Sequence, residues 1–198
     1  MMTLWQRNKE TKGSKKCLPL LSFITFLSVL SVFAVENISA VEDPYEALRV
    51  VKPKTVKPAP LFTLKGLDGE KINLQDYKGK TVLLNFWATW CVPCKEEMPA
   101  MQKLYNAFEE KGFVILAVSL DKGERMEVIS FVNEHSLTFP VLLDPGQRAR
   151  KKYFVTALPT SYLIGPEKKL KGFISGARDW DSDDAFKLIN TLILENKN

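Results

Sequence analysis

Cysteine and histidine are scarce in this sequence. Its 198 residues include three cysteines and one histidine. Three cysteines cannot form the disulfide framework of small cross-linked secreted domains, so that class is excluded. A structural zinc site needs about four ligands, and His135 is the one histidine that could join Cys91 and Cys94. We therefore expect no metal and no cofactor.

Compositional bias and internal repeats are also absent. Apolar residues make up 45% of the chain and charged residues 26%, which excludes a disordered or collagen-like chain. The net charge is +5, but residues 1–40 hold five Lys and Arg against two Asp and Glu, which is +3 of that total. Most of the basic excess thus lies at the N-terminus. No interleaving of basic and aromatic residues is present elsewhere, so we expect no nucleic-acid partner.

Charge is missing altogether from residues 17–35, which follow the basic residues 1–16. This order is typical of an export signal. The 19 uncharged residues exceed the usual apolar core of a signal peptide, about 7–15 residues, and approach the roughly 20 of a spanning helix. Residues 1–40 are therefore interpreted either as a signal peptide, cleaved after Ala34 or Ala40, or as a retained membrane anchor. Both interpretations place the rest of the chain outside the cytoplasm.

Four prolines lie within residues 41–60. Proline removes a backbone donor and restricts the residue before it. The stretch therefore predicts an extended linker that holds the domain of residues 61–198 away from the membrane.

Short apolar segments alternate with amphipathic ones from residue 61 onward. Asp68 and Gly69 between two short apolar stretches predict a β-hairpin. Residues 81–87 and 113–120 are largely apolar runs that predict buried strands. The alternation of strands and helices predicts an α/β fold with a central sheet covered on both faces. The other expected elements are helices over 95–111, 124–135, 148–154 and around 186–193, and strands over 141–143, 161–164 and 170–174.

Cys91 and Cys94 lie three residues apart, where a predicted strand gives way to a predicted helix. This spacing can close a small disulfide ring and reopen it, because a helix N-terminus favours the thiolate. We expect Cys91 to be the exposed nucleophile and Cys94 to resolve the mixed disulfide. Pro93 suits an early helix position, where its missing N–H costs nothing. An inert structural disulfide is the alternative, although so short a loop constrains the unfolded chain little.

The segment Asn85–Cys94 (Asn-Phe-Trp-Ala-Thr-Trp-Cys-Val-Pro-Cys), with the following Lys-Glu-Glu-Met-Pro, resembles the TlpA/ResA-like extracytoplasmic thiol–disulfide oxidoreductases of the thioredoxin superfamily. Further matching motifs are Ala157–Thr160 and Gly176–Trp180, and the likeness runs from about residue 59 to the C-terminus. The resemblance implies a thioredoxin fold, with a central mixed sheet flanked by helices and an N-terminal β-hairpin.

Four residues are predicted to bind substrate, and the same resemblance implies two of them. Pro159 matches a proline that is cis in thioredoxin-like proteins and faces the dithiol. The backbone of Leu158 would pair with an extended substrate segment. Trp90 and Pro93 are predicted to contact substrate because they lie beside the cysteines in the sequence.

Glu97 is the third implied catalytic residue, after Cys91 and Cys94. In the TlpA/ResA-like group an acid at this position manages the protons of the cysteine pair, and a raised pKa would suit that work. The alternative is a first-turn acid that complements the helix dipole. Asn85 stands where thioredoxin has a buried acid, and an amide cannot exchange protons. This difference moves the proton-transfer role toward Glu97.

The function implied is reduction of disulfide-containing protein substrates outside the cytoplasm, with electrons from a membrane thiol donor protein. Apocytochrome c is a frequent target of such proteins. A disulfide-forming oxidase is one alternative, but that class inserts a large helical domain, and residues 120–140 have room for one helix. A peroxiredoxin-like peroxidase and a non-enzymatic tethered binding module are further alternatives. The basic cluster Arg148–Lys152 is interpreted as a solvated face.

Overall fold

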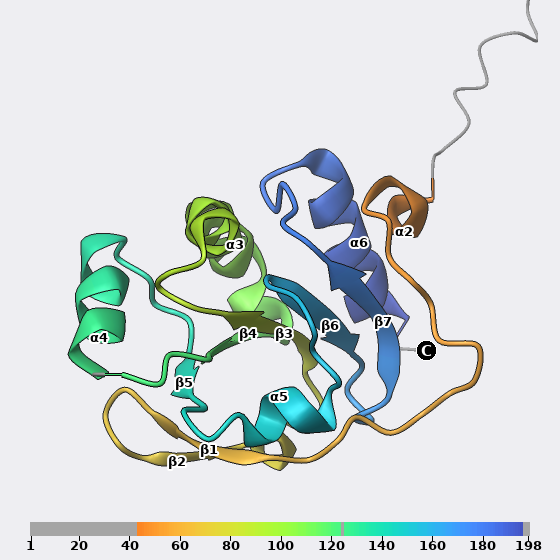
Figure 1. Cartoon of the computed structure of the whole chain (residues 1–198). Coiled ribbons are helices and arrows are strands. Elements are labelled where there is room, and N and C mark those ends of the chain that lie inside the picture. Colours follow the sequence, from red (N-terminus) through yellow and green to blue (C-terminus); the bar gives the residue numbers. More distant parts are fainter. Residues whose placement is uncertain (1–42, 124, 196–198) are drawn as a thin grey trace, which may run out of the picture. The chain divides into compact units, whose positions relative to one another are not determined.

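The structure is a computed structural model that describes residues 43–123 and 125–195 (Figure 1). The predicted signal peptide or anchor, residues 1–40, lies outside the described residues. Among the helices of those two ranges, none has the length and apolar character needed to cross a membrane.

A seven-stranded mixed sheet forms the centre of the domain, in the order β2-β1-β5-β4-β3-β6-β7. The central strands β3, β4 and β5 run parallel, and the strands on both sides of them pair antiparallel. The predicted hairpin is the β1–β2 pair. The mixed sheet of the predicted fold class is therefore confirmed. The strands are β1 (Thr63–Gly66), β2 (Lys71–Asn73), β3 (Thr81–Trp87), β4 (Phe113–Ser119), β5 (Val141–Leu143), β6 (Thr160–Ile164) and β7 (Leu170–Ser175).

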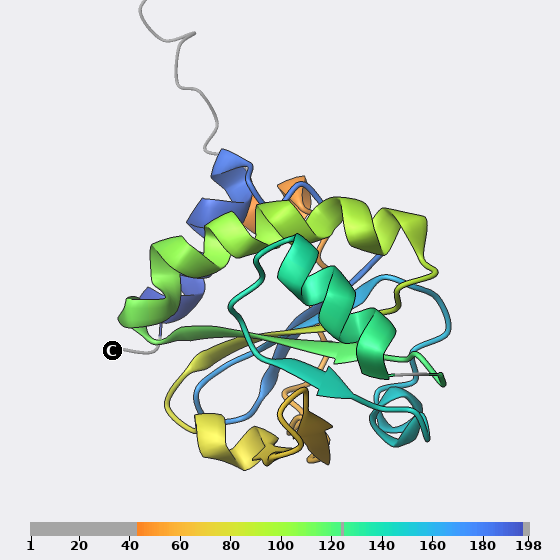
Figure 2. The same cartoon turned by 90° about the vertical axis from the view of Figure 1, so that its left-hand side faces the viewer.

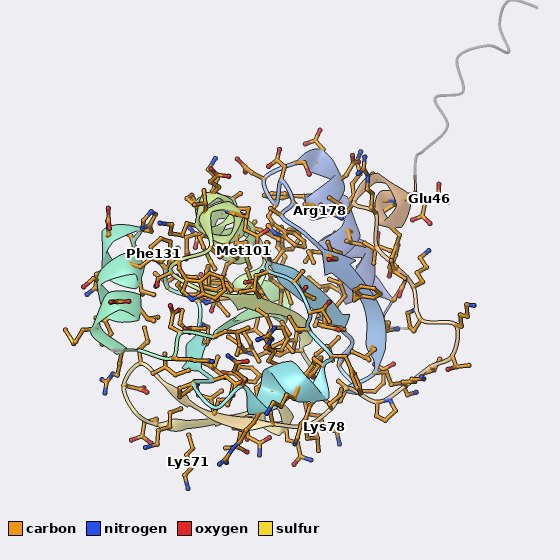
Figure 3. The ribbon with its side chains drawn as sticks, viewed as in Figure 1. Glu46, Lys71, Lys78, Met101, Phe131 and Arg178 are labelled. Atoms are coloured by element: carbon orange, nitrogen blue, oxygen red, sulfur yellow. A yellow bond between two sulfur atoms is a disulfide. The ribbon has the colours of Figure 1, made fainter. Side chains whose placement is uncertain are left out.

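Helices cover both faces of this sheet, as Figures 1 and 2 show. On one face, α3 (Val92–Phe108), α4 (Arg125–Glu134) and α6 (Asp183–Leu194) pack on a core that includes Met101 and Phe131, labelled in Figure 3. On the other face lie α5 (Arg148–Lys152) and the 3-10 helix η1 (Leu74–Tyr77). A second 3-10 helix, η2 (Glu109–Lys111), continues α3 and ends at Gly112, whose φ of 89° favours glycine.

Strand β3 shows why the sheet has two cores. Successive side chains of a strand point to opposite faces. Leu83 and Trp87 accordingly belong to the core under α3, while Leu84 and Phe86 belong to the core on the α5 side. Asn85 lies in register with the first pair, so this polar residue faces α3. All seven residues of β3 are buried.

The expected linker differs from the structure. Residues 44–47 form the helix α2 (Pro44–Ala47), and the carboxylate of Asp43 accepts the N–H of Tyr45 at 3.0 Å. Tyr45 and Leu48 are buried in the core that also holds α6. The prediction of an extended linker from residue 41 was wrong here, because an acid followed by proline is itself a helix-start signal.

Residues 52–60 are not helical, as their prolines predicted, but they do not leave the domain. Backbone bridges join Val51 to Phe173 and Pro58 to Lys169. This stretch therefore covers the exposed edge of β7, which limits pairing of that edge with other chains.

Candidate active site

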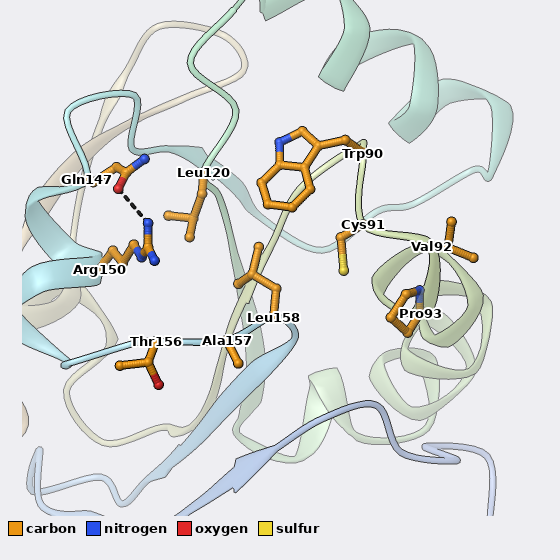
Figure 4. A pocket seen from close by; sticks show the side chains of 10 residues that line it. All are labelled: Trp90, Cys91, Val92, Pro93, Leu120, Gln147, Arg150, Thr156, Ala157 and Leu158. Atoms are coloured by element: carbon orange, nitrogen blue, oxygen red, sulfur yellow. Dashed lines mark hydrogen bonds between the residues drawn. The ribbon is translucent and has the colours of Figure 1, made fainter.

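The two cysteines form a disulfide at the start of α3. Cys91 is the N-cap residue of the helix, Cys94 lies in its first turn, and their Cα atoms are 5.3 Å apart. Cys94 is fully buried, whereas Cys91 lines a groove of about 520 Å³ (Figure 4). Cys91 is itself only 7% exposed, so the expectation of an exposed nucleophile was wrong for this disulfide form. A thiol partner in the groove would still meet Cys91 and not Cys94.

The groove brings together several of the predicted substrate-binding residues. Trp90, Pro93 and Leu158 line it with Cys91, and Figure 4 shows Leu158 and Trp90 on the two sides of the space in front of the sulfur. Trp90 is 68% exposed. Pro159 is buried next to Leu158 and is not among the lining residues. Their role in binding substrate stays a prediction.

The peptide bond between Leu158 and Pro159 is cis, which confirms that expectation. Two hydrogen bonds hold the turn around it. Thr160 Oγ1 donates to the carbonyl of Ala157 at 2.8 Å, and the N–H of Gly176 donates to the carbonyl of Pro159 at 2.8 Å. The turn thus leaves the backbone of Leu158 beside the groove.

Glu97 lies one turn after Cys94 in α3, and its side chain is buried. Oε1 accepts a hydrogen bond from Asn85 Nδ2 at 2.8 Å. Oε2 accepts two, from the backbone N–H of Arg178 at 3.1 Å and from Trp180 Nε1 at 3.0 Å. Both carboxyl oxygens are therefore satisfied inside the protein.

Burial raises the pKa of Glu97 to about 7, because it disfavours the charged form of the carboxyl. The hydrogen bonds from Arg178, Asn85 and Trp180 act in the opposite direction and lower this pKa. The balance leaves a carboxyl that exchanges its proton near neutral pH, as general acid–base work requires. A first-turn acid that only complemented the helix dipole would lie at the surface, as its exposed neighbour Glu96 does.

Asn85, on β3, connects this carboxyl to the strand β6. Its Nδ2 also donates to Ser161 Oγ on β6 at 3.0 Å, while its Oδ1 is buried without a hydrogen-bond partner. Buried polar atoms rarely lack a partner. The amide oxygen of Asn85 can therefore accept a further hydrogen bond beside Glu97.

Arg178 and Trp180 are site residues that sequence reasoning did not assign. They lie 81 and 83 residues from Glu97 along the chain. The signal available was the Gly176–Trp180 motif before the last helix, which resemblance identified without giving it a role. Arg178 also donates from Nε to the carbonyl of Leu48 at 2.8 Å, on the side of α2 (Figure 3). The segment of α2 and the buried carboxyl thus share one arginine.

The loop that carries Trp90 and Cys91 is tied to the end of β4. The carboxylate of Asp121 accepts hydrogen bonds from the N–H of Thr89 at 3.1 Å, from Thr89 Oγ1 at 2.7 Å and from Ser119 Oγ at 2.7 Å. Asp121 is itself buried. This cluster fixes where the strand β3 ends and the active loop begins.

Trp87 is a core residue, and its ring lies 5.1 Å from that of Phe131. His135 follows α4, where its ring stacks on Phe131 at 4.1 Å, outside the groove of the cysteines. Within residues 43–123 and 125–195, no group of three or more His, Cys, Asp or Glu is placed to hold a metal ion.

Comparison with known proteins agrees with this geometry. The model of the AhpC/TSA family matches residues 55–173. The chain is similar to a thiol-disulfide oxidoreductase ResA of Oceanobacillus iheyensis, with 39% identity over 183 residues, 89% of this chain and 91% of the relative. It is also similar to ResA of Bacillus anthracis, with 48% identity over 120 residues, 61% of this chain and 69% of the relative.

Solved structures show the same fold. A thiol:disulfide interchange protein of the thioredoxin family from Chlorobium tepidum superposes with a TM-score of 0.60 and 28% identity, over 71% of this chain and 99% of that one. StoA from Bacillus subtilis superposes with a TM-score of 0.56 and 29% identity, over 65% of this chain and 96% of that one.

Proposed function

This chain belongs to the ResA-like thiol–disulfide oxidoreductases of the AhpC/TSA family, and we propose that it reduces protein disulfides outside the cytoplasm. The observation that carries the proposal is the different accessibility of the two cysteines. The groove reaches Cys91, while Cys94 is buried one turn before a carboxyl with a pKa of about 7. This arrangement supplies an attacking sulfur, a resolving sulfur and a proton acceptor.

The first step is attack by the Cys91 thiolate on one sulfur of a substrate disulfide. A sulfur–sulfur bond forms between Cys91 and the substrate, the substrate disulfide breaks, and its second sulfur leaves as a thiolate that takes up a proton. The N-terminus of α3 favours the negative charge on Cys91 before attack. Leu158 offers its backbone to the substrate segment beside that sulfur.

In the second step the Cys94 thiol loses its proton and attacks the sulfur of Cys91. The mixed disulfide breaks, the second substrate thiolate leaves, and the Cys91–Cys94 disulfide forms, so two electrons have passed to the substrate. We assign the proton of Cys94 to Glu97, because this carboxyl is buried in the same face of α3 and its pKa lies near neutrality. Asn85, Trp180 and the N–H of Arg178 position it.

Reduction is favoured over oxidation by the connection between β4 and β5. Within its described residues, α4 (Arg125–Glu134) is the one helix of that connection. The large inserted helical domain that disulfide-forming oxidases carry at this place is therefore not accommodated here. A thiol:disulfide interchange protein is among the solved relatives of similar fold.

The proposal extends to location and partners. Residues 1–40 act as a signal peptide or membrane anchor, which leaves the domain outside the cytoplasm. A membrane thiol donor protein returns the Cys91–Cys94 disulfide to the dithiol. The haem-binding cysteines of apocytochrome c are the proposed substrate class, supported by the resemblance of Asn85–Cys94 to the TlpA/ResA-like group.

Reduction of insulin by the full chain tests this function. Cys91→Ser abolishes turnover because the attacking sulfur is gone, and Cys94→Ser stops after one step and accumulates a mixed disulfide with the substrate. The third cysteine, Cys17, lies in the uncharged N-terminal stretch. Cys17→Ser in the full chain is the matched control, since it removes a sulfur and leaves the dithiol intact. Full activity of Cys91→Ser contradicts the mechanism. Proteins captured by Cys94→Ser, identified by mass spectrometry, name the substrate.

A further inference from the structure

The groove at Cys91 continues into a second hollow beside α5. This hollow, of about 370 Å³, is lined by residues that we call the α5 surface: Gln147, Arg150, Lys151, Phe154, Val155 and Thr156. Gln147, Arg150 and Thr156 also line the groove of Cys91, so the two hollows adjoin. Figure 4 shows these three residues at the end of the groove away from Cys91 and Pro93. A substrate segment that passes Leu158 can therefore extend onto the α5 surface.

Phe154 is the residue of the α5 surface that local structure does not explain. The helix α5 ends in a Schellman motif, in which the N–H of Phe154 donates to the carbonyl of Lys151 and the N–H of Val155 to that of Arg150. Glycine usually occupies the position of Phe154 in this motif, because φ is positive there. Phe154 nevertheless adopts a φ of 53° and is 86% exposed.

A large aromatic side chain thus occupies a position that disfavours side chains and gains almost no burial in return. Neither the backbone nor the core accounts for this choice. Backbone outliers with no structural benefit are found at functional sites, and exposed apolar residues beside a groove are typical of contact surfaces. The structure points to a contact made by Phe154 with another molecule.

The charges of α5 indicate what kind of molecule would bind there. The helix α5 carries four cations in five residues, and within the described part of the chain none of them forms an ion pair with a carboxylate. Lys152 donates to the carbonyl of Leu61, and the guanidinium of Arg150 to Gln147 and the carbonyl of Val155. The carboxylate of Asp144 is buried and accepts hydrogen bonds from the backbone N–H groups of Arg148 and Arg150. The exposed charge is positive.

We propose that the α5 surface binds an acidic and apolar segment of the substrate protein, close in sequence to the disulfide that Cys91 attacks. An apolar side chain of the substrate packs on Phe154, and neighbouring Asp or Glu side chains face Lys151 and the other cations of α5. This inference rests on the proposed function and narrows its substrate class to disulfides flanked by acidic residues. The basic cluster is then a recognition element and not merely a solvated face.

The test uses three disulfides with the reduced full chain. Two are peptides with one internal disulfide, flanked on both sides by Asp-Leu-Glu in one and by the uncharged Asn-Leu-Gln in the other. The third is 2-hydroxyethyl disulfide, which is uncharged and too small to reach beyond the groove. Second-order rate constants are measured by the change in Trp fluorescence, and the ratio between the two peptides cancels any change in the dithiol itself.

The proposal expects the acidic peptide to react roughly three to ten times faster than the uncharged one at low salt. The ratio should approach one at about 1 M salt, because exposed charges are then screened. Lys151→Glu should lower the ratio, while Lys54→Glu, which makes the same change of charge at an exposed site outside both hollows, should not. A ratio of one in the parent protein, or equal effects of the two substitutions, overturns the proposal.

Phe154→Gly removes the aromatic side chain without risk to the fold, because glycine suits the positive φ and the ring is exposed. Its melting temperature should match or exceed that of the parent protein. For each peptide, the rate constant is divided by that for 2-hydroxyethyl disulfide, and this ratio should be lower in Phe154→Gly than in the parent protein. Equal ratios in the two proteins overturn the role of Phe154. Failure of the parent protein to reduce 2-hydroxyethyl disulfide contradicts the proposed function, whereas its reduction without a preference between the peptides contradicts the α5 surface alone.

Discussion

The side-chain amide of Asn85 donates a hydrogen bond of 2.8 Å to the carboxyl of Glu97, in the buried layer between β3 and α3. The amide oxygen of Asn85 has no partner of its own. If the side-chain amide of Asn85 rotates by half a turn, its oxygen faces Glu97 in place of its nitrogen. The hydroxyl of Ser161 fits both orientations, because it can donate as well as accept a hydrogen bond. Asn85 can thus meet Glu97 in either protonation state, which suits a carboxyl that gives and takes a proton during exchange.

Replacing Asn85 should move the titration of Glu97. The hydrogen bond from Asn85 lowers the pKa of this carboxyl, so Asn85→Leu, which removes the donor in a side chain of similar shape, should raise that pKa above its value of about 7. Carbon-13 NMR of labelled glutamate follows the titration. Ser161→Ala is the control, because it leaves the contact between Asn85 and Glu97 in place. A pKa that stays constant or falls in Asn85→Leu contradicts the assigned contact.

Stability should depend on pH through Glu97. Its pKa is about 7 in the folded protein against 4.5 for an unperturbed glutamate, so folding takes up a proton between these values. The free energy of unfolding is therefore expected to fall as pH rises from about 4.5 to about 7, and to stay lower above that range. The pKa difference corresponds to roughly 3 kcal/mol at most.

Glu97→Gln should remove this dependence, because an amide mimics the neutral carboxyl and Asn85 can accept from it. Urea unfolding of the oxidised protein at pH 5 and pH 8 measures the effect. The free energy of unfolding of Glu97→Gln should equal that of the parent protein at pH 5 and exceed it at pH 8. Glu96→Gln, at the exposed neighbouring position, should keep the parent's profile. An unchanged profile in Glu97→Gln would falsify the burial argument.

The active loop should depend on Asp121. Its carboxylate accepts hydrogen bonds from Thr89 and Ser119 in a buried cluster, and Asp121→Ala leaves these donors without a partner. An unsatisfied buried donor costs about 1–3 kcal/mol. Ser119 is fully buried, whereas Thr89 is half-buried and its two donors can reach water, so we expect a loss of about 2–3 kcal/mol in the free energy of unfolding. Lys122→Ala, next in the chain and exposed, should lie within about 0.5 kcal/mol of the parent protein. Thermal unfolding distinguishes the two.

The helix α2 should behave as part of the domain. Leu48 is 5% exposed in the core that holds α6, so Leu48→Ala should cost about 2–3 kcal/mol. Val56→Ala, a deletion at a residue that is 73% exposed, should change stability by less than about 0.5 kcal/mol. Equal stabilities of the two variants in urea unfolding would show that the segment before β1 is a free linker after all.

Local signals predicted most of the fold. The Asp68-Gly69 turn, the apolar runs of β3 and β4 and the helical spacing of α3 each depend on residues close in sequence, and each is found in the structure. The cysteine pair could likewise be placed because both sulfurs lie in one helix turn. The helix α2 was missed because the prolines after it dominated the interpretation of residues 41–60, although Asp43 and Pro44 carried a start signal.

Long-range contacts could not be predicted from the same signals. The partners of Glu97 come from β3, β6 through Asn85, and the segment before α6, up to 83 residues away. Periodicity shows that a strand is buried, but not which helix crosses over it. Glu97 was therefore identified as a candidate while the side chain of Trp180 that binds it was not. The sequence also could not show that Phe154 has a positive φ, because no sequence pattern supplies that angle.

The reduction potential of the Cys91–Cys94 disulfide tests the central claim most directly. Equilibration of the purified protein with buffers of oxidised and reduced dithiothreitol, read by the fluorescence of Trp90 and its neighbours, gives the value. The reduction potential of a protein-disulfide reductase should be about −270 mV or lower, because its dithiol must give electrons to substrate disulfides. A potential near about −120 mV would mark a strong oxidant and contradict the account.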